Sequence, residues 1–176
     1  MGAIELLGNA ASRTPTRNPT TARTHPACPT LGHHFRPNAE SFFVSPHGEF
    51  KVNYQINEFG LRDSGMISTF GRAPVMIALG DAFVEGWGIM PEATFTRELQ
   101  RQFRQLDGAD QFTRILNAGM TGYGAAQSYL LGQRLLDKLE ADVLFFVYTR
   151  VMSVADHRFL ANAEVDANGI AIRANE

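Results

Sequence analysis

Residues 74–88, P-V-M-I-A-L-G-D-A-F-V-E-G-W-G, decide the fold of this chain. The apolar run at residues 75–79 carries no charge, which is typical of a strand covered on both faces of a parallel sheet. Gly80 and Asp81 end the run, because glycine permits a tight turn and aspartate is a favoured helix N-cap. The segment therefore predicts a strand, a tight turn and a helix in direct succession, with Ala82 directly after the turn.

The rest of the chain continues this alternation of strands and helices. Further strands are expected at residues 52–56, where apolar and polar residues alternate, at the short segment 114–117, and at residues 142–148, which indicate a third buried strand. Two amphipathic helices are expected where apolar residues recur every fourth position, at Phe95, Leu99 and Phe103 and at Leu131, Leu135 and Leu139.

This order of elements predicts an α/β fold with a three-layer, doubly wound, mostly parallel sheet. Strands that alternate with helices imply right-handed crossovers, which place helices on both faces of the sheet. We expect the core within residues 50–150. The pair Asn168-Gly169, between Val165 and Ile170, predicts a C-terminal β-hairpin.

The composition is that of an ordinary globular protein with one compact domain, since 44% of its 176 residues are hydrophobic and 19% are charged. A net charge of −2 argues against nucleic acid as a partner. Cys28 is the only cysteine, so no intrachain disulfide is expected. No apolar run reaches the roughly 20 residues of a membrane-spanning helix. Residues 1–8 are too short and polar for a signal peptide, so a cytoplasmic location is expected.

An extended arm is expected at residues 1–39, ahead of an α/β domain at residues 40–176. Residues 6–39 contain no Asp or Glu and hold five of the eight prolines, a composition that buries too little apolar surface to order itself. The arm is either a solvated tail or a segment that becomes ordered on a partner. In the second case its four arginines are the candidate contacts: Arg13, Arg17, Arg23 and Arg36.

Two glycine-rich blocks and two upstream segments resemble the SGNH/GDSL hydrolase family. The blocks are residues 80–88 and 117–124, G-D-A-F-V-E-G-W-G and N-A-G-M-T-G-Y-G, and the segments are residues 31–38 and 57–63. The resemblance covers residues 31–175 and implies a flavodoxin-like fold. It also implies an ancestral chemistry of ester hydrolysis or acyl transfer on carbohydrate or lipid esters. Family members are often exported, which makes an extracytoplasmic or periplasmic location the alternative.

The resemblance also implies a catalytic site that this chain has largely lost. The family supplies a serine nucleophile, a glycine amide, an asparagine side chain and a histidine base. Those positions here carry Ala82 for the serine, Gly122 for the glycine and Met152 for the asparagine, with Asp81 beside Ala82. The family's C-terminal Asp-x-x-His block has no counterpart, so the domain is interpreted as C-terminally truncated. Because a methyl group is no nucleophile, we expect a pseudoenzyme that uses no cofactor.

Two functional classes remain open from the sequence. The favoured one is a non-catalytic structural or accessory subunit of a larger assembly, bound to protein partners and in one version associated with a membrane. The alternative is an inactive or partial chain of an esterase or O-acyltransferase. In the first case a partner covers the truncated sheet, and Phe145, Phe146 and Tyr148 are expected to be partly exposed without it.

Other chemistry-bearing side chains give weaker signals. A cluster of four lies close together in the sequence but lacks the two tight ligand pairs of a zinc site, so no metal is expected at His25, Cys28, His33 and His34. Asp81 is expected to cap the turn rather than to act as a base. Trp87 either lines the pocket or packs as a core aromatic. The hydroxyls of Ser128 and Ser153 have no evident base. His157, next to Asp156, is expected to be a solvated or capping residue.

Overall fold

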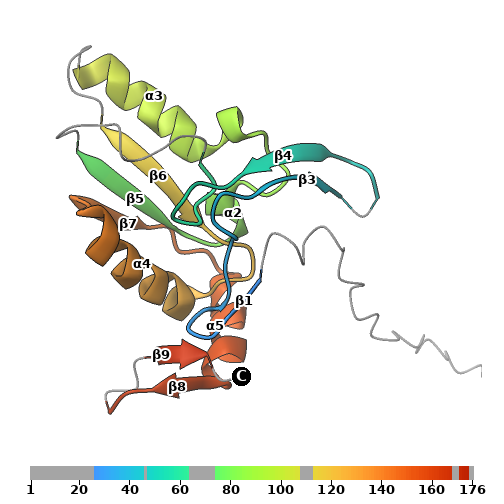
Figure 1. Cartoon of the computed structure of the whole chain (residues 1–176), viewed down its shortest axis with the longest axis vertical. Coiled ribbons are helices and arrows are strands. Elements are labelled where there is room, and N and C mark those ends of the chain that lie inside the picture. Colours follow the sequence, from blue (N-terminus) through green and yellow to red (C-terminus); the bar gives the residue numbers. More distant parts are fainter. Residues whose placement is uncertain (1–25, 46, 64–73, 108–112, 168–170, 175–176) are drawn as a thin grey trace, which may run out of the picture.

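The computed structural model describes residues 26–45, 47–63, 74–107, 113–167 and 171–174 (Figure 1). Its elements in chain order are β1 (Ala27–Cys28), β2 (Gly32–His33), β3 (Glu40–Val44), β4 (Lys51–Gln55), β5 (Val75–Gly80), α2 (Ala82–Glu85), the short 3-10 helix η2 (Pro91–Ala93), α3 (Phe95–Asp107), β6 (Arg114–Gly119), α4 (Ala125–Leu139), β7 (Val143–Phe146), α5 (Met152–Leu160), β8 (Ala163–Val165) and β9 (Ala171–Ala174).

Strands β5, β6 and β7 form a parallel sheet in the order β6-β5-β7. The strands predicted at residues 75–79, 114–117 and 142–148 are these three, so the α/β fold class is confirmed. Strand β7 is shorter than predicted and is half-buried or exposed along its length, whereas the sequence predicted a buried strand there. After β5 the chain adds β6 on one side of it and then β7 on the other. The central strand β5 is therefore the point at which the direction of strand addition reverses.

Helices α3 and α4 cover different faces of this sheet (Figure 1). Successive side chains of a strand point to opposite faces. In β7, the Phe145 ring packs edge-on against Phe95 of α3, with ring centroids 6.4 Å apart. The adjacent Leu144 instead lies under Gly132 of α4. The helices predicted around residues 95–103 and 131–139 are thus confirmed, one on each face.

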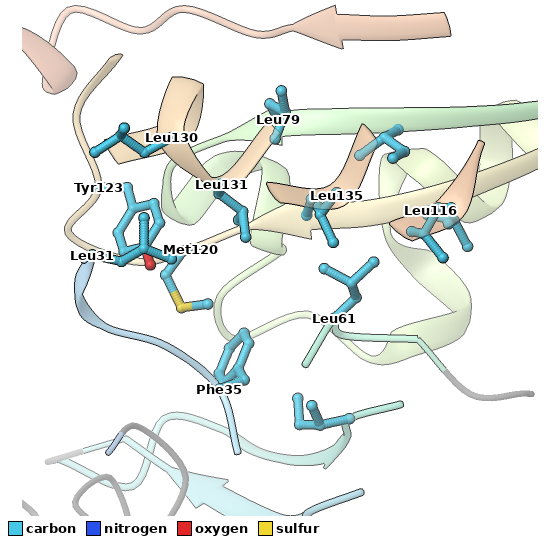
Figure 2. Close-up of a cluster of buried hydrophobic side chains, with 14 of the residues drawn as sticks. Leu31, Phe35, Leu61, Leu79, Leu116, Met120, Tyr123, Leu130, Leu131 and Leu135 are labelled. Atoms are coloured by element: carbon cyan, nitrogen blue, oxygen red, sulfur yellow. The ribbon is translucent and has the colours of Figure 1, made fainter. Parts of the chain in front are cut away.

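The main hydrophobic core lies between the sheet, α4 and the N-terminal segment (Figure 2). Leu31 and Phe35 are fully buried in the same cluster as Met120, Leu131 and Leu135. These two residues belong to the predicted arm, so its boundary at residue 39 needs a correction. The Pro- and Thr-rich composition around them hid two strongly apolar positions that pack on α4 and on the loop after β6.

The described part of the predicted arm begins at residue 26, with the small β1–β2 hairpin. Residues 1–25, which include Arg13, Arg17 and Arg23, lie outside the described residues. Arg36 is exposed. The arm hypothesis therefore stays a prediction for residues 1–25 alone.

Two further antiparallel hairpins flank the parallel sheet. The β3–β4 hairpin pairs Ser41 with Tyr54, and Tyr54 is buried as its alternation with Val52 predicted. The β8–β9 pairing confirms the predicted C-terminal hairpin, although its turn at Asn168 and Gly169 lies outside the described residues. No helix in the described part of the chain is long and apolar enough to cross a membrane.

Strand β7 pairs with β5 alone among the described strands. The aromatic side chains that follow along it are partly exposed, as predicted: Phe145 is half-buried, Phe146 is 41% exposed and Tyr148 is 59% exposed. Val143, at the start of the strand, is 42% exposed. Among the described strands, the outer strand β7 therefore carries apolar side chains that are partly exposed.

The backbone of α2 packs directly on the carboxyl end of β6, and this contact predicts the effect of one substitution. A Cβ atom on Gly119 would lie 2.1 Å from the Glu85 amide nitrogen and 2.5 Å from the Val84 carbonyl carbon. Because backbone atoms cannot swing aside, we expect Gly119→Ala to lower the free energy of unfolding by at least about 2 kcal/mol.

Urea unfolding followed by circular dichroism measures this change. Gly132→Ala is the matched control, since its new methyl would meet mainly a flexible Leu79 side-chain carbon at 2.7 Å. Equal losses for the two variants would contradict the role assigned to the α2–β6 contact.

Candidate functional site

The four positions singled out by the family resemblance all follow the carboxyl ends of the parallel strands. Asp81 and Ala82 follow β5, Gly122 follows β6, and Met152 follows β7. Backbone hydrogen bonds hold the three exits together: the Met120 amide donates to the Gly80 carbonyl at 3.0 Å, and the Val147 amide donates to the Leu79 carbonyl at 2.9 Å. Open α/β sheets bind ligands at this edge, where the strand order reverses.

Asp81 caps helix α2 and is 96% buried, at 4% exposure. Its Oδ1 atom accepts a hydrogen bond from the Phe83 amide at 3.0 Å. Its Oδ2 atom accepts a short hydrogen bond from the hydroxyl of Thr149, which follows β7. Both carboxylate oxygens therefore serve to fix the turn and to join it to the neighbouring strand exit, as the capping interpretation of Asp81 expected.

Ala82 is the first residue of α2 and is half-buried. Met152 is fully buried, and its sulfur accepts a hydrogen bond from the Thr149 amide at 3.4 Å. Thr149 thus bonds to Asp81 with its hydroxyl and to Met152 with its backbone. Gly122 is exposed and has a φ angle of +85°, a conformation that glycine adopts without strain.

The four positions provide no nucleophile and no base. Ala82 offers a methyl, Met152 a weakly accepting thioether, Gly122 only its backbone, and the Asp81 carboxylate is already engaged on both oxygens. The structure at these positions is a strand, a tight turn and a helix, formed by β5, Gly80–Asp81 and α2.

Ser153 and Asp156 make hydrogen bonds to the backbone, and His157 is exposed. Asp156 Oδ1 accepts a hydrogen bond from the Ala126 amide at 2.8 Å, which caps the first turn of α4 from α5. Gly124, at the N-cap of α4, has no side chain to do this. The neighbouring His157 is exposed. Ser153 donates to the Arg150 carbonyl at 3.0 Å, which ties its hydroxyl to the backbone.

Trp87 is 44% exposed and packs edge-on against two aromatic rings from the β3–β4 hairpin segment. Its ring centroid lies 5.4 Å from that of Phe43 and 6.3 Å from that of Phe50. Trp87 therefore anchors the hairpin to the loop after α2.

The other hydroxyl candidate, Ser128, is fully buried in α4.

The histidines and the cysteine near the N-terminus are not brought together as a metal site. His33 Nε2 contacts the Thr121 carbonyl at 2.9 Å, and His34 Nε2 contacts the Phe59 carbonyl at 3.4 Å. Cys28 lies beside Arg134, 3.9 Å from its guanidinium. Within the described ranges, no group of three or more His, Cys, Asp or Glu side chains could hold a metal ion. His25 lies outside them.

Glu85 is a buried charged residue that the sequence analysis missed. It lies at the end of α2, is 2% exposed, and accepts hydrogen bonds from the Tyr54 hydroxyl at 2.7 Å and from the Thr121 amide at 2.5 Å. Burial raises the pKa of its carboxyl group, against the opposing hydrogen bonds from Tyr54 and Thr121 and the charge of Arg62. The alternating strand pattern that buries Tyr54 is the one local signal that pointed to this network.

Arg62 completes the network around α2. Its guanidinium lies over the Tyr54 ring, 3.9 Å from the ring centroid. It donates hydrogen bonds to the carbonyl oxygens of Glu85 at 2.8 Å, Gly86 at 2.6 Å and Ile89 at 2.6 Å. These contacts satisfy the backbone carbonyls at the end of α2, where cations are favoured. Arg62 and Glu85 together join the β3–β4 hairpin, α2 and the loop after β6.

Comparison with known proteins adds no family assignment. No protein-family model matches the sequence, and a search of curated proteins found no significant match.

His34 gives the site region a predictable dependence on pH. Its side chain is 8% exposed, and burial lowers its pKa from 6.5 to about 4, helped by the positive charges of Arg134 and Lys138. The unfolded chain therefore binds more protons than the folded chain between pH 4 and 6.5. We expect the free energy of unfolding to fall as pH drops through this window, by roughly 3 kcal/mol in total from this residue.

Urea unfolding at a series of pH values between 4 and 7.5 measures the slope. His34→Gln should flatten it relative to wild type, whereas substituting the exposed His157 by Gln should leave it unchanged. If the His34→Gln and wild-type slopes coincide, His34 does not carry this dependence.

Proposed function

We propose that this chain is a non-catalytic protein on an SGNH-hydrolase-like scaffold that serves as a structural or accessory subunit of a larger assembly. The observation that carries the proposal is that the turn after β5 is well fixed by hydrogen bonds, while the residue after it has no nucleophilic group. Asp81 caps the turn and is tied to Thr149, yet the position after it is Ala82. A catalytic serine there would need a base and oxyanion donors, and Met152 takes the place of one donor.

The proposal treats the carboxyl edge of the sheet as a binding surface. Exposed apolar side chains follow the carboxyl ends of β5 and β7: Phe83 is 69% exposed, Tyr148 is 59% exposed and Val151 is 62% exposed. These two strands are adjacent, and the Thr149–Asp81 hydrogen bond joins their exits. Clustered exposed apolar side chains on a protein surface favour association with a partner.

We expect no esterase activity from this chain. Purified protein should hydrolyse p-nitrophenyl acetate no faster than a heat-denatured control, because the Ala82 methyl cannot form an acyl intermediate. Ala82→Ser alone should also stay at background, since residues of a catalytic unit act together and restoring one recovers little. The double variant Ala82→Ser/Met152→Asn extends the test to the second lost position.

Turnover above the control that a serine-directed acylating reagent abolishes would overturn the non-catalytic assignment. A rise of more than about 100-fold on Ala82→Ser, comparable to the effect of one oxyanion donor, would reveal a base that the four positions do not supply.

The binding surface has its own test with a matched control. We expect Phe83→Ser/Tyr148→Ser to lose proteins that co-purify with the wild-type chain from its native source. Leu106→Ser should retain them, because Leu106 is 81% exposed on α3, away from the strand exits. If the co-purifying proteins are the same for all three chains, the carboxyl edge is not the contact surface.

A further inference from the structure

The loop at residues 120–124, which joins β6 to α4, is clamped from two sides by titratable side chains. Glu85 Oε2 accepts a hydrogen bond from the Thr121 amide at 2.5 Å. On the other side, His33 Nε2 lies 2.9 Å from the Thr121 carbonyl oxygen. One peptide unit on each side of Thr121 is thus held by a group that can gain or lose a proton.

The His33 side of the clamp keeps its hydrogen bond in both protonation states of the ring. A carbonyl oxygen can only accept, so His33 Nε2 carries the proton whether the imidazole is neutral or cationic. The Tyr123 hydroxyl also donates to the His33 carbonyl at 2.5 Å, which returns the loop to the same segment. The contact whose strength depends on protonation is therefore the hydrogen bond between the Thr121 amide and the Glu85 carboxyl group.

The Glu85 carboxyl group faces hydrogen-bond donors from two other parts of the chain and a positive charge from a third. Tyr54 from β4 donates at 2.7 Å to Oε1, and the amide of Thr121 donates to Oε2. The Arg62 charge faces it from the segment after β4. Burial is the largest influence and raises the pKa of Glu85, so it takes up a proton at higher pH than an exposed glutamate does.

The hydrogen-bond partners of the two oxygens favour Oε1 as the one that takes the proton. Oε2 faces an N–H group, which cannot accept a hydrogen bond. Oε1 faces the Tyr54 hydroxyl, which can turn and accept one. Protonation at Oε1 leaves Oε2 as a neutral carbonyl oxygen. The bond to the Thr121 amide then changes from a charge-assisted hydrogen bond to a neutral one of about half the strength.

We propose that Glu85 is a proton-sensitive latch: its ionised carboxylate holds the loop at residues 120–124 tightly, and its protonated form loosens that loop. Gly122 is the residue that the latch governs, because it follows Thr121 directly and is exposed at the carboxyl edge of the sheet. The latch couples solvent pH to the conformation of one wall of that edge, whatever binds there.

Nuclear magnetic resonance of the full chain between pH 4 and 9 tests the latch. In wild type, the carboxyl ¹³C shift of Glu85 and the amide proton shift of Thr121 should titrate with one shared midpoint. The Thr121 amide should move upfield as the pH falls. Glu85→Gln should remove that transition from Thr121 and speed its hydrogen exchange at least about tenfold above the midpoint, since a bond to a charged acceptor is lost. The exposed Glu92→Gln is the matched control and should titrate as wild type does.

The latch is overturned if Thr121 keeps the same transition in Glu85→Gln, or if Thr121 and Glu85 titrate with different midpoints in wild type. Should Glu85→Gln fail to fold, Tyr54→Phe decides. It keeps the carboxylate and removes a donor that favours the ionised form, so the shared midpoint should move to higher pH. An unchanged midpoint in Tyr54→Phe contradicts the latch.

Discussion

The burial of the Glu85 carboxylate is the constraint on which the rest of the structure depends. A charged group in the interior is tolerated only when donors surround it, because its desolvation costs several kcal/mol. Here the donors come from β4 and from the loop after β6, with the Arg62 charge nearby. Satisfying one side chain therefore fixes the relative position of the hairpin, α2 and the sheet. The bare backbone at Gly119 makes this arrangement possible, because a side chain there would displace the residue that carries the carboxylate.

A second set of polar contacts fixes the position of β7, as the Glu85 contacts fix the position of the β3–β4 hairpin. Thr149 bonds to Asp81 through its hydroxyl and to Met152 through its amide. The buried Asp81 carboxylate thereby joins the exit of the central strand to that of β7, and the Met152 thioether holds Thr149 within its own segment. Neither contact involves the side chain of Ala82.

Local patterns predicted the elements of the fold, and contacts distant in sequence account for what they missed. The strand at residues 75–79 follows from a continuous apolar run and the helix α4 from its repeating leucines, and both elements were predicted. Helix α3 was predicted correctly, but the face that it buries was not. Phe95, on the predicted apolar stripe, is 38% exposed, whereas the polar residues Thr96 and Gln100 are buried. Their polar atoms meet Asn117 and the Ile115 amide of β6, partners that no local pattern reveals. For the same reason, composition assigned Leu31 and Phe35 to an arm although they pack in the core.

The same distinction separates the scaffold of the candidate site from its chemistry. The capping role of Asp81 was predictable because an N-cap is set by its own neighbours in sequence. The engagement of its second oxygen depends on Thr149, 68 positions away. With both oxygens engaged, the carboxylate joins the turn after β5 to the exit of β7. The polar contacts at the carboxyl edge therefore position the turn after β5 and the exit of β7 relative to each other.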